Sequence, residues 1–227
     1  EGNIRHWAKG DIWYPRKRNP QREVSIREAG ATYMILKDDG GMLGEAGSAR
    51  ALCDLHPGAV YLHKGMQYRV AKLDMGEKKV FCRAAADLNY YTRAITNEET
   101  EILSVEGTKK LKDTVVNIGM LKVTERVLGY MKRHIQTDRN LGEFPLDLPP
   151  SVFTTLGVWM AVDEGILDGV RAAKYSVPGA LHAAEHCAIA TLPLFALCDR
   201  MDLGGVSYPF NPDMGSAAIF IYDGHEG

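Results

Sequence analysis

Two histidines and a glutamate near the carboxyl-terminal end have the spacing of a helical metal site. His182, Glu185 and His186 form the pattern H-x-x-E-H, and positions i and i+4 of a helix lie one turn apart on the same face. Such a pair can hold zinc, and in the inverted zincin pattern the glutamate is the general base of a hydrolase. Buried polar groups more often form hydrogen-bonded packing networks. A hydrolytic site, a structural or adventitious metal site and a packing network are therefore the open interpretations.

Acidic residues that could complete such a site follow the histidines. The stretch CDRMDLGG contains Asp199, Arg200 and Asp202, and Asp223 ends the stretch IFIYDG. An Asp could be a third ligand only if the fold returns it to the helix. The alternative is a lattice of Asp and Arg side chains that orients the loop, with Arg200 paired to carboxylates.

Cations beside aromatic residues in the amino-terminal part form a candidate nucleic-acid surface. Aromatic rings can stack on bases, while Lys and Arg neutralise phosphates on single strands. The candidate DNA-binding residues are Arg16, Lys17, Arg18, Tyr61, Lys64, Arg69 and Lys72. A solvated linker for the first three and ordinary barrel residues for the others are the alternative interpretations.

The charge of the chain is unevenly distributed. Residues 1–140 hold 24 Lys and Arg against 18 Asp and Glu, whereas residues 141–227 hold 3 against 11. A basic surface attracts phosphates and an acidic one repels them, so DNA contact is expected in the amino-terminal part. The sequence has no G-x-x-x-x-G-K-[ST] phosphate loop, G-x-S-x-G elbow or G-x-G-x-x-G fingerprint. These absences exclude a P-loop motor and the hydrolase and dinucleotide-binding classes that carry such motifs.

Composition indicates a globular protein of one large or two modest domains, with 45% hydrophobic and 25% charged residues. No apolar run approaches the roughly 20 residues of a membrane helix, so no membrane partner is expected. The four cysteines lack C-x-x-C spacing, which predicts reduced, buried thiols and a cytoplasmic location. The first residues carry neither Met nor a signal pattern and suggest the interior of a longer polypeptide.

The secondary-structure elements that would position these residues, as predicted from sequence patterns, indicate an α+β protein. Residues 1–30 are expected to form a connector, and residues 31–108 a small β-barrel-like module, because short strands alternate there with tight turns. The predicted strands of this module are 31–37, 59–63, 67–74, 78–84 and 89–96.

Residues 109–227 are expected to form a mixed α+β domain with a long C-terminal helix. Strands are predicted around Val115 to Ile118, at 151–162 and at 217–221, while 123–131 fits a strand or a helix. Helices are predicted at 163–173 and 179–197, the second starting at Pro178 and kinked or divided by Pro193.

Several motifs resemble one helicase family. In order, HxxEH, CDRxDxGG and IFIYDG closely resemble the C-terminal domain of MrfA-type DEAD/DEAH-box DNA helicases, in which a zinc-binding domain follows the motor. Weaker similarity runs through LHPGAVYLHKGMQYRV, residues 55–70, and DLNYYT, residues 87–92, so the likeness covers most of the chain.

The resemblance implies a non-catalytic accessory region of an ATP-dependent DNA helicase that acts in DNA repair. Its implied partners are DNA, preferably single-stranded, and the motor domains of the same polypeptide. ATP, Mg²⁺ and zinc are implied for the parent protein and no cofactor for this chain, because the family's four-cysteine cluster is expected after Gly227. The residues expected to be structural are His182, Glu185, His186, Asp199, Arg200, Asp202 and Asp223. A zinc-dependent hydrolase using His182, Glu185 and His186 and a purely structural docking module are the alternatives.

Overall fold

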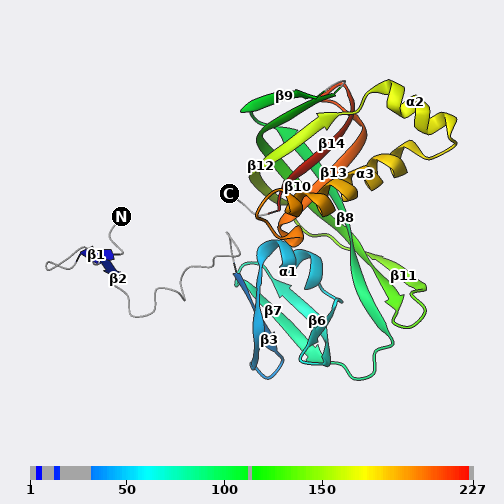
Figure 1. The fold of residues 1–227 in the computed structure, drawn as a ribbon. Helices are drawn as coiled ribbons and strands as arrows, with labels where there is room; N and C mark the ends of the chain where they lie inside the picture. The colour runs from blue at the N-terminus through cyan, green and yellow to red at the C-terminus, as the bar shows by residue number, and fades with distance from the viewer. Residues whose placement is uncertain (1–3, 7–12, 16–31, 112–113, 225–227) are drawn as a thin grey trace.

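The computed structural model describes residues 4–6, 13–15, 32–111 and 114–224. Within the predicted connector, two short strands are described, β1 (Ile4–His6) and β2 (Trp13–Pro15), which pair antiparallel. All other described elements belong to two larger sheets and the helices that cover them (Figure 1).

The amino-terminal module is a five-stranded sheet in the order β4-β3-β7-β6-β5. Its strands are β3 (Thr32–Lys37), β4 (Met42–Gly47), β5 (Val60–His63), β6 (Met66–Asp74) and β7 (Lys79–Ala84). β3 pairs parallel with β7, and the other neighbours are antiparallel. The predicted strands in this region are confirmed, whereas β4 and helix α1 (Ser48–Asp54) were not predicted. α1 covers one face, where Ile35, Leu55 and Tyr68 are among the buried residues of the core.

The second sheet has seven strands built around one long strand, β10 (Thr114–His134). Five strands follow the order β11-β10-β12-β14-β13, and β8 and β9 also pair with β10. The remaining bounds are β8 (Tyr90–Ile102), β9 (Gly107–Leu111), β11 (Asn140–Pro145), β12 (Ser151–Ala161), β13 (Leu203–Asn211) and β14 (Ser216–Asp223). Residues 123–131, which also fitted a helix, are strand because β10 has partners along both edges.

In the second part, α3 (Val177–Thr191) lies against β13 and β14, and α2 (Glu164–Ala172) packs on α3. α2 is capped by Asp163, whose Oδ1 accepts a 2.8 Å hydrogen bond from Gly165 N. α3 has Ser176 as its N-cap and a proline in its first turn, where a missing amide hydrogen costs no helical bond. α3 packs on β13 and β14 through Leu181, Glu185 and Ile189.

The last helix is shorter than predicted, whereas the prediction that Pro193 kinks or divides it is confirmed. The helix ends at Thr191 and not at Leu197, and Pro193 lies in a short 3₁₀ turn, η2 (Leu192–Leu194). A proline inside an α-helix removes a backbone hydrogen bond and clashes with the preceding turn, so the α-helix stops before it. A second 3₁₀ turn, η3 (Arg200–Asp202), leads into β13, which was not predicted.

The predicted α+β class, with a β-rich amino-terminal module and a long carboxyl-terminal helix, is confirmed. The two sheets are joined by hydrogen bonds: Val60 N donates to Thr92 Oγ1 over 2.9 Å, and the Gln67 side chain bonds both backbone groups of Leu88. The predicted domain boundary at residue 108 stays a prediction. β8, which precedes this residue, pairs with β10, which follows it. In the described part of the chain, no helix is long and apolar enough to span a membrane.

Candidate functional site

The H-x-x-E-H residues gather at one turn of α3. The Nε2 atoms of His182 and His186 lie 3.1 Å apart, and the ring planes meet at 74°. His182 Nδ1 lies 3.4 Å from Oε2 of Glu185, and the same oxygen accepts a 2.8 Å hydrogen bond from Ser207 Oγ. The imidazoles are exposed, whereas Glu185 is only 3% exposed. The three residues therefore form a hydrogen-bonded cluster at the edge of the helix packing.

Glycine in β13 allows α3 to approach the sheet at this turn. A Cβ atom on Gly205 would lie 2.8 Å from Ile189 Cδ1 and 3.2 Å from Glu185 Cγ. Real Cβ contacts are rarely this short, so a side chain at this position would require Ile189 and its neighbours to shift. Gly205 of the CDRxDxGG motif is thus what brings Glu185 within reach of Ser207.

The rest of this motif folds as a capped turn. Asp199 Oδ1 accepts a 2.9 Å hydrogen bond from Met201 N, and Asp202 Oδ2 accepts one of 3.3 Å from Asp199 N, which together form a capping box around η3. The Asp202 carbonyl accepts a 2.7 Å hydrogen bond from Gly224 N. These hydrogen bonds orient the loop and hold it against the end of β14. The pairing of Arg200 with carboxylates stays a prediction.

A cavity of about 320 Å³ lies beside α3. It is lined by residues from α3, η3 and five strands of the seven-stranded sheet: Glu98, Val123, Glu125, Phe153, Glu185, His186, Ile189, Arg200, Met201, Leu203, Gly204, Gly205, Tyr222 and Gly224. The carboxylates of Glu98, Glu125 and Glu185 and the guanidinium of Arg200 thus line the same cavity. A cavity with this excess of acidic groups repels phosphate, so DNA contact is expected on another surface.

Electrostatics inside the cavity raise the pKa values of Glu98 and Tyr222. Burial raises the pKa of Glu98, the hydrogen bond from Tyr222 opposes this rise, and the charges of Glu125 and Glu185 add to it. Burial, and then the Glu98 charge, also raise the pKa of Tyr222.

Burial and the Glu125 carboxylate raise the pKa of Cys53, whose thiol donates a 3.2 Å hydrogen bond to Glu125 Oε1. Cys53 is therefore a poor nucleophile.

Asp223 is the last residue of β14. Its carbonyl oxygen accepts a 2.8 Å hydrogen bond from Thr155 Oγ1 of β12, and its side chain is exposed. The preceding residue, Tyr222, donates a 2.7 Å hydrogen bond to Glu98 Oε2. The Y-D-G stretch therefore fixes the end of β14 against β12 and β8.

The geometry gives no support to a hydrolase. Among the described residues, the one group able to hold a metal is His182, Glu185 and His186, so Asp199, Asp202 and Asp223 supply no third ligand to it. A general base must face the water that it activates, yet Oε2 of Glu185 is already bound to Ser207.

The cysteines do not form the zinc cluster that the family resemblance implies. In residues 32–111 and 114–224, no group of metal-ligating side chains contains a cysteine, and the residues present do not fit a four-cysteine site. Cys82 is buried, but Cys187 is exposed. Cys53 and Cys198 are partly exposed. The prediction that all four thiols are buried therefore holds for Cys82 and is wrong for Cys187, which lies on the exposed side of α3.

The predicted DNA-binding residues fall on different surfaces. Arg16, Lys17 and Arg18 lie outside the described residues. Tyr61 packs toward the core, with its ring centroid 6.5 Å from that of the buried Tyr68. Arg69 follows Tyr68 along β6 and therefore points to the opposite, exposed face.

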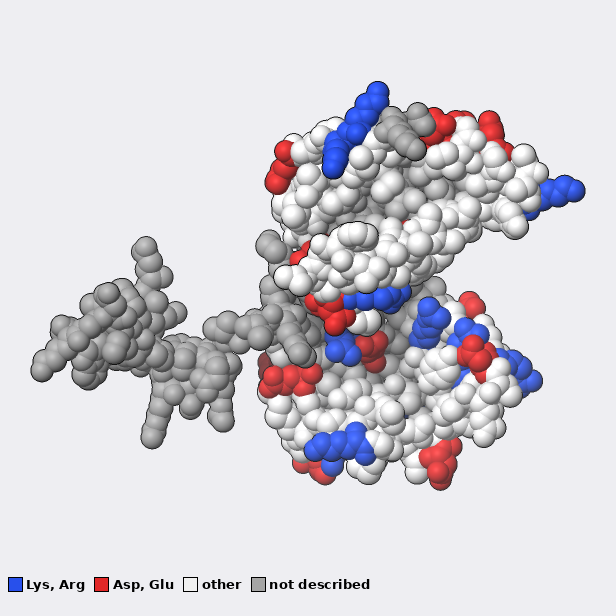
Figure 2. Space-filling view, viewed as in Figure 1, with Lys and Arg blue, Asp and Glu red and all other residues white. Residues whose placement is uncertain are grey.

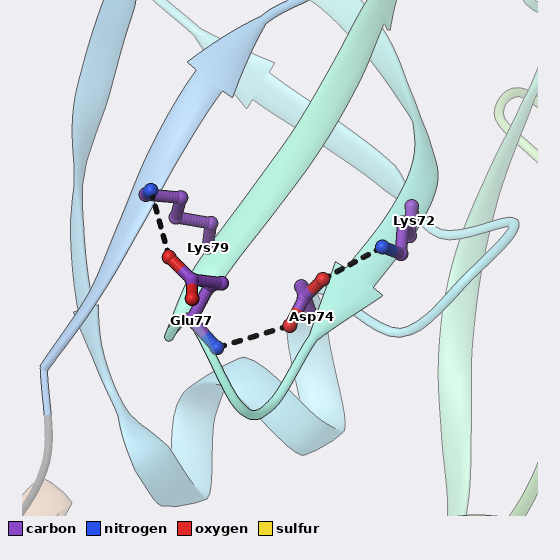
Figure 3. A network of polar contacts seen from close by, with 4 residues as sticks. All are labelled: Lys72, Asp74, Glu77 and Lys79. Carbon is purple, nitrogen blue, oxygen red and sulfur yellow. Dashed lines mark hydrogen bonds and ion pairs between the residues drawn. The ribbon is translucent and has the colours of Figure 1, made fainter.

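The two lysines of this set differ in their surroundings. Lys64 is exposed in the turn between β5 and β6, with φ 49°. Lys72 Nζ lies 2.6 Å from Asp74 Oδ2, and Asp74 Oδ1 accepts a 3.0 Å hydrogen bond from Glu77 N. Figure 3 shows this network, which continues to Lys79. Lys72 thus has part of its charge neutralised, while Lys64 and Arg69 are the stronger candidates for phosphate contact.

A second group of cations and rings was missed by sequence reasoning. Lys132 Nζ of β10 lies 4.3 Å from the ring centroid of Phe144 and 5.1 Å from that of Tyr90. The lysine and the two rings come from three neighbouring strands, so only the pairing of β8 and β11 with β10 reveals the group. Figure 2 shows Lys and Arg side chains, interspersed with acidic ones, over the lower module and along the furrow between the two parts of the molecule.

Comparisons with known proteins point to one family. Residues 184–227 match the family model of the MrfA Zn-binding domain. The whole chain is 29% identical to the uncharacterized ATP-dependent helicase YprA of Bacillus subtilis over 234 residues, which cover 29% of that protein. It is 23% identical to the ATP-dependent helicase HRQ1 of Saccharomyces cerevisiae over 156 residues, which are 68% of this chain and 14% of that protein.

The fold is similar to that of a solved helicase. The crystal structure of the helicase MrfA bound to DNA matches with a TM-score of 0.61 and 26% identity over 99% of this chain and 30% of that chain. The match therefore spans about 30% of the length of YprA and of the solved MrfA chain, and 14% of that of HRQ1. The predicted resemblance to the C-terminal region of MrfA-type helicases is confirmed.

Proposed function

We propose that this chain, which has the sequence and fold of the C-terminal region of MrfA-type helicases, is a non-catalytic module that binds DNA and braces the motor domains of the same polypeptide. The observation that carries the proposal is the match of 99% of the chain to a helicase in complex with DNA. A role in DNA repair, a cytoplasmic location and a parent that uses ATP, Mg²⁺ and zinc are parts of the same proposal.

Phosphate contact would be made by the exposed cations of the amino-terminal module and by the furrow next to it. Arg69 and Lys64 are exposed, and neither lies beside the acidic cavity. Such contacts neutralise phosphates without recognising the base sequence. The partly exposed ring of Tyr90 beside Lys132 would add an aromatic and cationic contact that suits unpaired bases, which favours single-stranded DNA.

The bracing role is supported by an exposed apolar segment after α3. Phe195 is 87% exposed and Met201 is 81% exposed, and Leu194 and Leu197 are also exposed. Contiguous apolar surface of this kind is typical of protein contacts. We propose that a motor domain covers this segment.

Salt titration of single-stranded DNA binding tests the proposal. Fluorescence anisotropy with a labelled oligonucleotide should show that log affinity falls linearly with log salt, with a slope of roughly 0.7 per phosphate contacted. The double variant Lys64→Ala/Arg69→Ala should bind more weakly. The slope of log affinity against log salt should become shallower by the amount expected for the loss of about one to two phosphate contacts.

Arg171→Ala is the matched control, because Arg171 is exposed on α2 but already pairs with Glu164 and Asp168 at 2.6 Å. It should bind DNA as the unsubstituted chain does. Binding that is indifferent to salt, or no binding together with full association to the motor domains, would identify a purely structural docking module instead.

A further inference from the structure

We propose that His182 and His186 form a binding site for a divalent transition-metal ion, with Nε2 of each imidazole as a ligand and Glu185 as the residue that orients His182. The site goes beyond the proposed function, because it requires neither DNA nor a motor domain. It also differs from the family's four-cysteine cluster, which the cysteines of this chain do not form.

The separation of the two nitrogens is that of two ligands on one ion. Zinc binds imidazole nitrogen at about 2.0–2.1 Å. Two such nitrogens lie roughly 2.9 Å apart at a right angle and roughly 3.4 Å apart at the tetrahedral angle, from the same bond length. The observed 3.1 Å between the Nε2 atoms of His182 and His186 falls between these values. An ion can therefore bind both with little movement of either ring.

The buried carboxylate sets the tautomer that a metal ligand needs. A carboxylate oxygen only accepts, so the contact of 3.4 Å between His182 Nδ1 and Glu185 Oε2 places the proton of His182 on Nδ1. The lone pair is then on Nε2, which is the atom that faces His186. A carboxylate that accepts from the far nitrogen of a ligating histidine is the usual second partner of protein zinc sites.

Glu185 is itself held in place from the sheet side. Ser207 Oγ donates to its Oε2 over 2.8 Å, and Gly205 leaves the room in which its side chain lies. The carboxylate is 3% exposed, while both imidazoles are open to solvent. The arrangement therefore combines a fixed orienting group with coordination positions that water can fill.

The ligand chemistry selects the class of ion. Two neutral imidazoles on a helix suit Zn²⁺, Ni²⁺ or Cu²⁺, whereas Mg²⁺ and Ca²⁺ prefer sets of oxygen ligands. The competing explanation of the short contact is a direct hydrogen bond, in which Nε2–H of His186 donates to Nε2 of His182. That arrangement predicts no affinity for metal beyond that of separate surface histidines.

Calorimetric titration of the reduced 227-residue chain with Zn²⁺ tests the site. We expect saturable binding of one ion per chain and no binding of Mg²⁺. His182→Ala and His186→Ala should each abolish this binding, and Glu185→Gln should weaken it by about 10- to 100-fold. Circular dichroism should show that the two alanine variants keep the fold, because both imidazoles are exposed.

Two variants serve as controls. Cys187→Ser tests the exposed thiol next to His186, and His63→Ala tests a histidine on the other sheet. Both should bind Zn²⁺ as the unsubstituted chain does. Loss of binding in Cys187→Ser would replace the proposed ligand set with a thiolate site, and unchanged binding in His182→Ala would overturn the proposal.

A measurement on the unsubstituted chain avoids any dependence on folding of the variants. Nitrogen-15 spectra of the histidine rings should show the Nε2 signals of His182 and His186 moving together on Zn²⁺ addition, while Nδ1 of His182 keeps its proton. Movement of Nδ1, or spectra that do not change up to millimolar Zn²⁺, would contradict the proposed geometry.

Discussion

The Tyr222 hydroxyl donates a 2.7 Å hydrogen bond to Glu98 Oε2, and so connects β14 to β8 across 124 positions of the sequence. Glu98 lies directly opposite Glu125 in the pairing of β8 with β10. Like charges opposite each other in a sheet are destabilising. The tyrosine hydroxyl is therefore the donor that allows a carboxylate to remain in this acidic cavity.

Removal of this donor should destabilise the fold. Tyr222→Phe leaves the ring packed against Phe153 but takes away the hydrogen bond to Glu98. A lost hydrogen bond to a charged, partly buried group costs about 1–3 kcal/mol, and the free energy of unfolding at pH 7, measured by urea denaturation, should fall by that amount. In the background of Glu98→Gln the same substitution should cost less. Equal costs in both backgrounds would show that the two side chains are not coupled.

Stability should depend on pH through Glu98. Because folding raises the pKa of this carboxyl, the folded state binds the proton more tightly, and stability is lost as pH rises from the unfolded to the folded pKa. The Glu98→Gln variant has no proton to lose at this position, so its folding stability should not fall as pH rises through this range. The substitution also relieves the repulsion with Glu125, so it should raise the free energy of unfolding at pH 7 by roughly 0.2–1 kcal/mol. The gain should shrink as pH falls to 4. Denaturation at both pH values checks the sign, and a gain that is larger at pH 4 would contradict it.

Gly205 should be intolerant of any side chain. The Cβ of Gly205→Ala would meet Ile189 Cδ1 at 2.8 Å and the Phe220 carbonyl oxygen at 3.0 Å. Overpacking of this kind costs about 1–3 kcal/mol, which thermal denaturation would detect. Gly169→Ala in α2 is the matched control, since nothing lies within 4 Å of its Cβ. The control should stabilise the helix by up to about 1 kcal/mol, so a similar loss in both variants would argue against close packing at Gly205.

Thiol reactivity should distinguish the cysteines. Burial raises the pKa of Cys82 to about 11, so little thiolate exists at pH 8, whereas Cys187 is exposed on α3. An aromatic disulfide reagent should modify Cys187 rapidly in the native chain, and Cys82 only after unfolding. Cys187→Ser should remove one rapidly reacting group, and Cys82→Ser should remove none. A rapid phase unaffected by Cys187→Ser would contradict the exposed position.

DNA affinity should depend more on Arg69 than on Lys72. Lys72 is held 2.6 Å from Asp74, so removal of the lysine also frees an acidic group close to its own position. Arg69→Ala should lower the slope of log affinity against log salt by about 0.7, the value for one phosphate contact on a single strand. Lys72→Ala should lower it by less. Equal slopes for all three chains would place the contact on another surface.

Local patterns predicted much of the secondary structure. Strands 31–37, 67–74 and 78–84 follow from alternating apolar residues and tight turns, and the start of the last helix follows from Pro178. Two of the strands that were not predicted, β4 and β13, are rich in glycine, which weakens strand propensity. β4 and β13 form strands despite this weak propensity, because they pair with β3 and β14. β11 was also not predicted, and the sequence pattern favours a loop for its last residues, 144–145.

The sequence alone determined the helical face that joins His182 to His186, since residues four apart in a helix are neighbours whatever surrounds them. It also carried the motifs by which the family resemblance was found. Only the tertiary structure decided that Glu98, Glu125 and Glu185 share one cavity, and that Tyr61 and Arg69 lie on opposite faces. The physical reason is that contacts within one helix follow from its period, while contacts between strands follow from pairing and register, which depend on burial across the whole fold.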